Sequence, residues 1–471
     1  MGSVALRQFV RTSAAAVFMA LASSCVPTVT VSGDLSREQA SDDLAYLGRT
    51  LVEAHPNAFF KQSRRAYESL VRTERDTLPG RVDDKELFLR AARIAASIGD
   101  AHTQVAPYIR AYDRWRAAKG TVLPFEVRSI GTRFVVAADF RRKDKLPNGA
   151  ALLIINGRPI DTIVSNISHF VSGEQESLKR SFIAEDFRVW LFIEGIYSPF
   201  HIRYLTPEGR MRETIVEGVT IDQIHFWDQT QTGRQALSDF NFRFLPGNVG
   251  DLELHTFSDK ANFRAFFRRS FHELAKTHAH DLIIDLRENS GGSTEVGDLL
   301  LSYITDKPFR QLSRIETRVS AVTKKALGHD KYVWVYGERA WNTADGNLIS
   351  WHIGPESHKS PPDQFNGRTF VLIGPGTFSS AAIFAASTQD AKIARILGRE
   401  SGGLPTLYGE TFYFDLPNSG LEASVATKYL VRPNGDESPH GVVPDVQLGS
   451  SLQLGPDPEL QSAVRLVRSA L

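Results

Sequence analysis

Short apolar runs, each ending in a glycine-containing turn, recur in the second half of the chain and predict buried strands followed by helices. Residues 282–284 and 369–373 are two such runs, and helical stretches are expected after them, at 294–305 and up to about 389. Unbroken apolar runs of this length are typical of strands buried on both faces of a sheet. The alternation of strands and helices therefore predicts an α/β layer structure over residues 245–450.

The flanking segments of this region extend the prediction. Residues 249–257 are expected to form a strand, and residues 262–278 a helix with Phe263, Phe266, Phe267 and Phe271 on its buried side. Residues 331–366 are rich in Trp, Gly, Asn and Pro, and we expect a long loop there that borders the functional site. A C-terminal helix is expected within 451–471.

Nearer the N-terminus the apolar residues recur at helical spacing. Ser36 with Gln39, and Asp83 with Glu86, have the spacing of a capping box and predict the starts of two helices, with a third helix between them. Residues 36–120 are therefore predicted to form a helical domain.

Residues 121–218 instead carry short strand-like runs separated by turn signals, of which Asn156-Gly157 is the strongest. Within this β-rich part, about 164–199 is a long segment with aromatic positions at Phe187, Trp190, Phe192 and Tyr197. We expect it to be a helical insertion that packs on the β-rich unit or covers the active site.

Composition limits the classes of function. The chain has 471 residues, 42% of them hydrophobic, which is enough for two or three domains with a large core. The balance of 55 basic against 54 acidic residues argues against a nucleic acid partner. A single cysteine excludes an internal disulfide.

The first residues are typical of a targeting signal. Arg7 and Arg11 precede an apolar run, 14–22, that is too short to span a bilayer. The run ends at Cys25 in a sequence, Leu-Ala-Ser-Ser-Cys, that resembles the bacterial lipoprotein box, in which the cysteine is lipidated. We therefore expect residues 1–25 to be a lipoprotein signal peptide and 26–35 a tether, with a lipid anchor in the cell envelope, facing the periplasm and in the outer membrane rather than the inner. The alternative is a secretory signal cut elsewhere.

Two strand-to-helix turns carry the candidate chemistry. The first turn ends in Gly291 and Gly292, which allow the backbone to approach a ligand with its N–H groups. The second turn places Ser379 among small residues before a helix, where a hydroxyl is exposed at the positive end of the helix dipole. Each turn also has a purely structural interpretation, namely a tight βα turn and a helix N-cap.

In this order, the motifs Asp-Leu-Arg-Glu-Asn-Ser-Gly-Gly (285–292) and Thr-Phe-Ser-Ser-Ala-Ala (377–382) resemble the C-terminal-processing (tail-specific) and tricorn-core family of serine peptidases. The resemblance continues through 396–400 and 441–445. It implies a crotonase-like α/β peptidase core at 245–450 and a PDZ-like module at 121–218. Such modules can bind a peptide as an added strand, although the insertion leaves open whether the groove is retained.

The resemblance also distinguishes two catalytic bases. Tail-specific members use a lysine about 25 residues after the serine, but Leu404 stands there, and Lys392 and Lys428 do not fit the pattern. Tricorn-like members use an upstream histidine, and Asp-Ala-His-Thr at 100–103 matches their motif, with Ala101 in place of glycine. His102 is thus the expected general base, since imidazole titrates near neutrality. The structural alternative is a histidine that stabilises the end of the preceding helix.

The resemblance implies the remaining site residues. The oxyanion hole would consist of a backbone amide of Gly291 or Gly292, with Gly291 preferred, and that of Ser380. Glu437 is the candidate third member of the triad, with Glu400 and Asp100 as alternatives. Asp285, Arg287 and Asn289 are expected to be structural.

Together these observations predict a serine-type endopeptidase that cleaves peptides or protein tails through an acyl-enzyme intermediate. No metal or other cofactor is expected, because no metal-ligand spacing is present. Two alternatives stay open: a catalytically inactive family member that binds a peptide or hydrophobic ligand, and an esterase with the same chemistry. The oligomeric state is not predicted.

Overall fold

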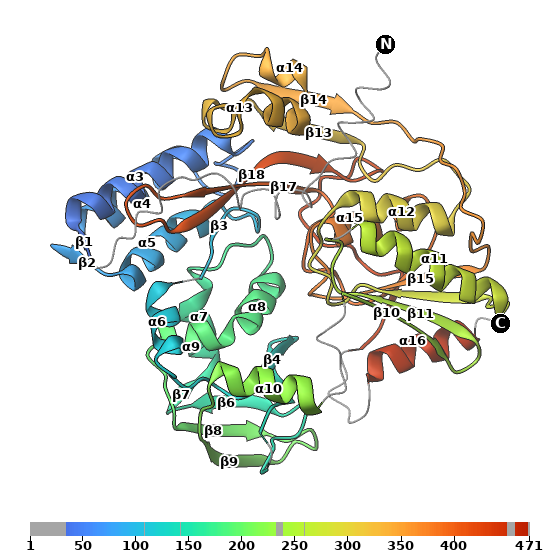
Figure 1. Ribbon diagram of the computed structural model, residues 1–471, viewed down its shortest axis with the longest axis horizontal. Coiled ribbons are helices and arrows are strands. Elements are labelled where there is room, and N and C mark those ends of the chain that lie inside the picture. Colours follow the sequence, from blue (N-terminus) through green and yellow to red (C-terminus); the bar gives the residue numbers. More distant parts are fainter. Residues whose placement is uncertain are drawn as a thin grey trace.

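The computed structural model describes residues 34–107, 109–141, 143–231, 239–258, 260–449 and 457–469. The predicted signal peptide, Cys25 and nearly all of the tether lie outside these residues. Figure 1 shows three parts: a helical domain in blue, a β-rich module in teal and green, and an α/β domain in yellow to red. The predicted α/β multidomain class is confirmed.

The helical domain follows the capping signals of the sequence. Ser36 and Gln39 form a complete capping box at the start of α3, and the Asp83 side chain accepts a hydrogen bond from the Glu86 N–H at the start of α5. The elements of this domain are β1 (Leu35–Ser36), α3 (Arg37–Ala54), α4 (Arg64–Asp76), β2 (Arg81–Val82), α5 (Asp84–Ala96), β3 (Gln104–Val105) and α6 (Arg110–Ala117).

The β-rich module is a sheet with strand order β4-β5-β6-β8-β9, to which β7 adds beside β6. Asn156 and Gly157 both have positive φ and form the predicted turn between β6 and β7. The expected helical insertion is present as α8 and α9. The elements are β4 (Phe125–Ile130), β5 (Arg133–Asp139), β6 (Ala151–Ile155), β7 (Arg158–Pro159), α7 (Ile160–Ser168), α8 (Glu176–Glu185), α9 (Phe187–Ile193), β8 (Phe200–Leu205) and β9 (Met211–Val216).

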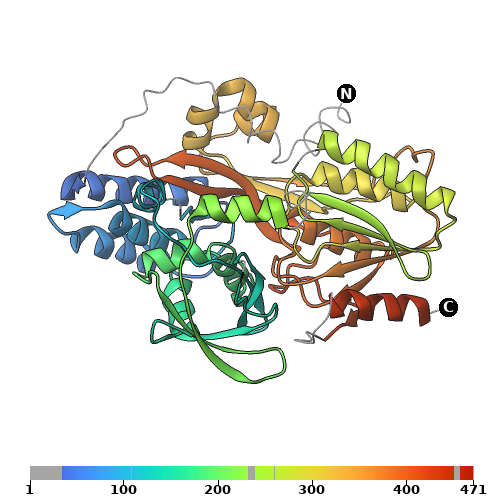
Figure 2. The same ribbon diagram turned by 60° about the horizontal axis from the view of Figure 1, so that its bottom comes forward.

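The α/β domain is built on a six-stranded sheet with order β10-β11-β12-β15-β16-β19, in which only β10 is antiparallel to its neighbour. In Figure 2, α11 and α12 lie on one side of this sheet and α16 on the other. Its elements are β10 (Phe240–Leu245), β11 (Val249–Leu254), α11 (Lys260–Lys276), β12 (Asp281–Asp285), α12 (Thr294–Ile304), β15 (Arg368–Ile373), α15 (Ser380–Asp390), β16 (Arg395–Gly398), β19 (Val446–Gln447) and α16 (Pro458–Ser469). Helix α10 (Ile221–Gln231) leads into this domain from the module.

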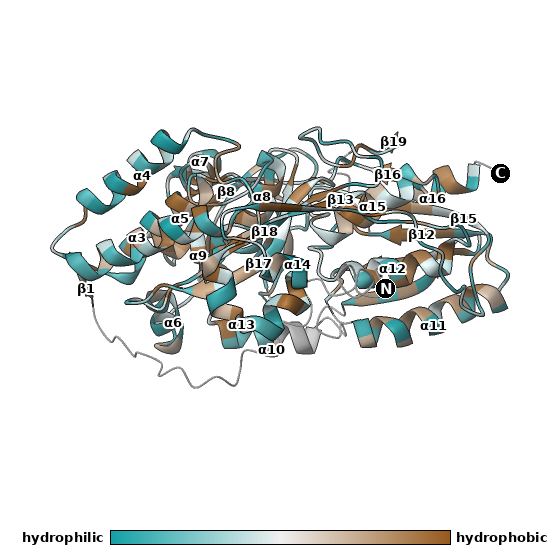
Figure 3. Ribbon diagram, turned by 90° about the horizontal axis from the view of Figure 1, so that it is seen from above, coloured by the Kyte–Doolittle hydropathy of each residue, from teal (hydrophilic) through white to brown (hydrophobic). Residues whose placement is uncertain are grey.

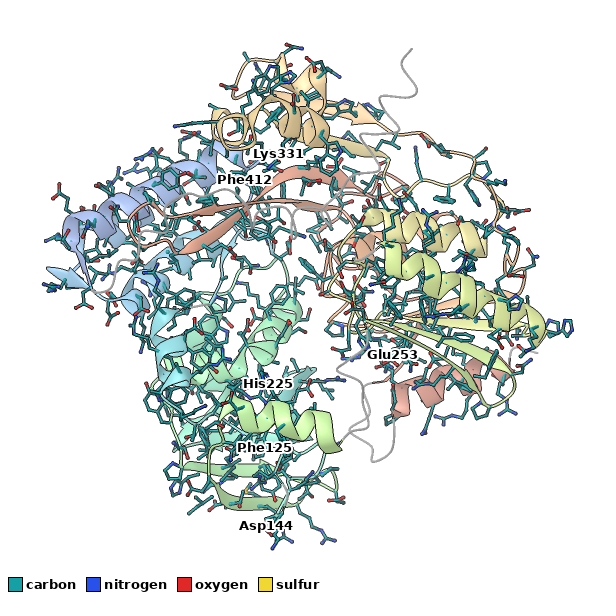
Figure 4. The ribbon with its side chains drawn as sticks, in the orientation of Figure 1. Phe125, Asp144, His225, Glu253, Lys331 and Phe412 are labelled. Atoms are coloured by element: carbon teal, nitrogen blue, oxygen red, sulfur yellow. The ribbon has the colours of Figure 1, made fainter. Side chains whose placement is uncertain are left out.

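The central strands are completely buried, as the apolar runs predicted. All five residues of β12 are buried, and Figure 3 shows the neighbouring strand β15 and helix α15 in the brown of apolar residues. Because parallel strands share one direction, β11, β12 and β15 end at the same edge of the sheet. Figure 4 marks Glu253 near the end of β11, on the side of the domain that faces the module. This is the edge where α/β proteins usually bind ligands.

A second sheet connects the α/β domain to the helical domain. It contains β13 (Arg314–Arg318), β14 (Leu348–His352) and the long hairpin of β17 (Leu407–Asp415) and β18 (Glu422–Val431). The hairpin extends over the helical domain, where Phe412, labelled in Figure 4, joins the core that includes α3 and α5.

The prediction of a long loop at 331–366 is wrong over much of its length. Helices α13 (Ala321–Tyr336) and α14 (Glu338–Trp341) and strand β14 occupy residues up to 352. Tyr332 and Tyr336 hold this segment in place, because they pack in a buried cluster with Val319 and Ile349. Only residues 353–367 form an extended connection.

Within the residues that the structure describes, no helix is both long enough and apolar enough to cross a membrane.

Candidate active site

Ser379 lies at the sharp turn between β15 and α15. Its φ of 53° and ψ of −127° place it in a backbone region that L-residues rarely occupy, at a typical cost of about 1–3 kcal/mol. Ser379 occupies the N-cap position of α15, yet its hydroxyl makes no capping hydrogen bond. The structural interpretation as a simple helix cap therefore does not account for this serine.

The two glycine-containing turns are fixed to each other. The Thr377 hydroxyl donates a hydrogen bond of 2.7 Å to the Leu286 carbonyl, and the Phe378 N–H donates one of 3.0 Å to the Asn289 carbonyl. Gly291 packs so closely that a Cβ atom there would lie 2.6 Å from Ser379 Cβ. Only glycine fits at this position, which explains the first of the paired glycines.

His102 reaches the nucleophile from the helical domain. It lies on the base loop, which we define as residues 99–103, after α5 and before β3. Strand β3 pairs with β18, and the Ser424 hydroxyl donates a hydrogen bond of 3.0 Å to the His102 carbonyl. His102 Nε2 lies 3.0 Å from Ser379 Oγ, and the ring of Phe378 stacks on the imidazole with centroids 4.7 Å apart. The structure thus brings together the two residues of the predicted nucleophile–base pair.

The electrostatic environment keeps this imidazole neutral. Burial lowers the pKa of His102 below its ordinary value, while the charge of Asp100 and the backbone of Tyr408 act in the opposite direction. The Nδ1 atom is buried and makes no hydrogen bond of acceptable geometry with a described residue. A neutral imidazole with its Nε2 toward a hydroxyl has the form required of a general base.

Asp100 lies directly behind the base. Its Oδ1 accepts a 2.9 Å hydrogen bond from the His102 N–H, and its Oδ2 lies 3.1 Å from His55 Nε2. Since the Asn57 N–H donates to His55 Nδ1, His55 Nε2 must carry the proton. Burial raises the pKa of Asp100, but hydrogen bonds from His55 and Thr103 lower it, and the net pKa lies below its ordinary value. Asp100 is therefore a buried carboxylate anion that fixes the base loop without touching the imidazole ring.

The candidate oxyanion-hole amides differ in whether their N–H groups already donate a hydrogen bond. The Gly291 N–H already donates a hydrogen bond of 2.9 Å to Asn289 Oδ1. The amides of Gly292 and Ser380 donate to no acceptor among the described residues. This corrects the preference for Gly291, whose amide is occupied because Asn289 forms a local turn with it.

Arg287 and Asp285 are structural, as expected, and they extend to the C-terminal helix. Arg287 Nε donates a hydrogen bond of 3.0 Å to Asp285 Oδ1, and its Nη1 donates to Asp457 at 2.8 Å and to Glu459 at 3.3 Å. The side chain of Arg287 is only 14% exposed. These contacts fix the turn before the paired glycines on the start of α16.

Glu437 and Glu400 do not contact His102. The Glu437 carboxylate accepts hydrogen bonds from Arg314, at 2.7 Å, and from the Tyr429 hydroxyl, at 2.9 Å. Glu400 accepts from the Gly441 N–H at 2.8 Å. The ring of Tyr429 contacts that of Tyr408 at a tilt of 38°, and the backbone of Tyr408 acts on the His102 pKa, so Glu437 is linked to the base only through two intervening residues. Its assignment as the third member of the triad stays a prediction.

Helix α8 of the module covers the nucleophile turn. Phe182 contacts the ring of Phe378 edge to face, with centroids 5.5 Å apart. Leu178 is buried against the loop that holds Gly402, where a Cβ atom would lie 3.3 Å from Leu178 Cβ. The predicted insertion therefore packs on its own module, along β4, and also against the candidate site.

Leu404, at the position of the tail-specific lysine, packs in an apolar cluster with Ile383, one turn after the nucleophile. Over the described part of the chain, no group of three or more His, Cys, Asp or Glu side chains is arranged to hold a metal ion.

Several residues at the site escaped sequence reasoning. His55, Phe182, Tyr408 and Glu174 (treated below) reach the site from segments distant along the chain. None belongs to a local motif, and only covariation between segments could have paired them with the base loop.

Comparisons with known proteins show what the sequence and the fold are similar to. Residues 248–448 match the model of peptidase family S41. The structure of mature CPAF complexed with lactacystin superposes with a TM-score of 0.65 at 17% identity, covering 92% of this chain and 97% of that one. Another structure of mature CPAF gives a TM-score of 0.65 at 16% identity, covering 92% and 96%. The photosystem II D1 C-terminal processing protease gives 0.47 at 16% identity, covering 87% and 93%.

The superposition on CPAF shows that the fold is shared over nearly the whole chain. Residues 248–448, which contain Ser379 and both glycine-containing turns, are similar to peptidase family S41, and the protein is a serine peptidase.

Proposed function

We propose that this protein cleaves peptides or unfolded protein tails through an acyl-enzyme intermediate formed on Ser379. The observation that carries the proposal is the distance of 3.0 Å between His102 Nε2 and Ser379 Oγ, at a serine with a strained backbone. A serine hydroxyl is a weak nucleophile until a neighbouring base removes its proton, and this geometry provides that base.

In the proposed mechanism, His102 takes the hydroxyl proton as Ser379 Oγ attacks the scissile carbonyl. The imidazolium that forms lies near the buried Asp100 anion, which stabilises it. The backbone N–H groups of Gly292 and Ser380 donate hydrogen bonds to the carbonyl oxygen as negative charge develops on it, and donors of this kind typically contribute about 100-fold to 1000-fold in rate. His102 then protonates the leaving amine, and water attacks the acyl-enzyme by the reverse sequence of proton transfers.

Incubation with a denatured model protein tests this function. We expect fragments from the wild type and none from Ser379→Ala or His102→Ala, with ester substrates cleaved by the same active site. Cleavage of esters but of no peptide would favour an esterase. Saturable peptide binding without any turnover would favour the inactive, ligand-binding alternative.

We also propose that the protein is anchored in the cell envelope by a lipid on Cys25. The support is the lipoprotein-like sequence that ends at this cysteine, the only one in the chain. Metabolic labelling with a radioactive fatty acid should mark the wild type and not Cys25→Ser. Equal labelling of both would contradict the anchor.

A further inference from the structure

The carboxyl group of Glu174 reaches from the β-rich module to the base loop. Glu174 stands two residues before α8. The backbone of Ala101 and the charge of Asp100, both on the base loop, act on the pKa of its carboxyl group. Its Oε2 atom is buried and forms no hydrogen bond with a described residue. A carboxyl oxygen from one domain thus lies buried beside the loop that carries the catalytic base from another.

The groups that face Glu174 come from three elements. Asp100 lies on the base loop. Lys61, from the connection after α3, lays its aliphatic stem over Gly99, where a Cβ atom would be 2.7 Å from Lys61 Cγ. Lys179, from the first turn of α8, interacts electrostatically with both Lys61 and Glu174. No ion pair joins either lysine to Glu174 in the described structure, so the carboxyl group is not neutralised by a direct partner.

These surroundings favour the uncharged acid. Burial and the charge of Asp100 raise the pKa of Glu174 to about 8, against the opposing effects of two backbone amides and Lys61. An uncharged carboxyl group can remain buried next to Asp100, whereas a second carboxylate there would be repelled by it.

We propose that Glu174 is a positioning residue of the active site, whose uncharged carboxyl group braces the base loop and so keeps His102 within reach of Ser379. This inference rests on the proposed function, because it assigns Glu174 a role through the catalytic base. It gives the module a part in positioning the catalytic base, in addition to the apolar contact between Phe182 and Phe378.

Ionisation of Glu174 has a definite consequence under this proposal. Loss of its proton places two carboxylates side by side in a buried site, and the module segment and the base loop separate. The fraction of molecules with His102 in place then falls as the pH rises. Glutamine has the same shape as the uncharged acid and does not titrate, so Glu174→Gln should keep the base loop braced at every pH.

The test is the rate of covalent labelling of Ser379 by a fluorophosphonate probe between pH 6 and pH 10. We expect the wild-type rate to fall above about pH 8, by up to about tenfold per pH unit if the ionised form is inactive. Glu174→Gln should lose this alkaline decline, and Glu174→Ala should be slow at all pH values. Glu208→Gln, on the exposed turn between β8 and β9, is the matched control and should follow the wild type.

Thermal unfolding of the same proteins adds a readout that is independent of catalysis. Because the folded state holds a proton on Glu174 that the unfolded state releases, wild-type stability should decline from about pH 4.5 to pH 8 relative to Glu174→Gln. An unchanged alkaline decline in Glu174→Gln, or wild-type rates in Glu174→Ala, would overturn the inference. Absence of labelling from every protein at every pH would instead overturn the proposed function.

Discussion

His55 and Asp100 form a buried pair in which His55 Nε2 donates a 3.1 Å hydrogen bond to Asp100 Oδ2. Both side chains are completely shielded from solvent. The pair supplies a fixed negative charge behind the catalytic base, although no carboxylate contacts the buried Nδ1 atom of that base in the described structure. In this site, stabilisation of the imidazolium therefore comes from a charge behind the base loop.

Replacement of Asp100 tests this role. Asp100→Asn removes the charge and places an amide N–H opposite the protonated Nε2 of His55. We therefore expect the free energy of unfolding to fall by about 1–3 kcal/mol and the labelling of Ser379 to become slower. The acid limb of the pH–rate profile should also move to lower pH, because the anion normally raises the His102 pKa. Urea unfolding and labelling rates measure both effects. Asp330→Asn, at a fully exposed position, should change neither.

The wild-type enzyme should remain active in mildly acidic solution. His102 acts as a base only when neutral, and its pKa is lowered from the ordinary value. The labelling rate at pH 6.5 should therefore exceed half of its plateau, and the half-maximal rate should fall at a lower pH. A midpoint above pH 7 would contradict the electrostatic description of the base.

Replacement of Gly291 by alanine tests whether its close approach to Ser379 is required. Gly291→Ala would drive a Cβ atom to within 2.6 Å of Ser379 Cβ, so labelling should fall by about 100-fold or more, the loss typical of a disrupted oxyanion site. Gly346→Ala is the matched control, because Gly346 has a similar φ, 85° against 93°, and open space around it. Equal labelling of the two variants would show that the close approach of Gly291 is not required.

Replacement of Arg287 should act mainly on the stability of the fold. Arg287→Ala leaves the Asp285 carboxylate, only 7% exposed, without its partner and releases the start of α16. Loss of one member of a buried ion pair typically costs about 3–5 kcal/mol, which chemical denaturation can measure. Arg64→Ala, which removes an exposed pair with Glu68, should be within about 0.5 kcal/mol of the wild type.

Local sequence patterns predicted the elements and part of the site. Ser36 and Asp83 begin their helices as capping rules require, and the buried strands β12 and β15 lie at the predicted positions. The structure also places Ser379 and His102 together, although 277 positions separate them in the chain, because the motif of each residue indicated its role.

What the sequence could not predict depends on contacts between distant segments. The family resemblance implies Glu437, but its side chain binds Arg314 and Tyr429, and no local pattern reveals that choice. The composition of 331–366 indicated a loop, yet burial of Tyr332 and Tyr336 against Val319 and Ile349 makes most of it regular structure. No local pattern indicates Glu174, since its environment comes from the base loop, the connection after α3 and the first turn of α8.

The central claim is that His102 activates Ser379, and covalent labelling followed by peptide mapping tests it most directly. A fluorophosphonate probe should mark the peptide that contains Ser379 in the wild type, and the mark should be absent from folded Ser379→Ala and His102→Ala. Absence of label from folded wild-type protein, or equal labelling of His102→Ala, would contradict the account.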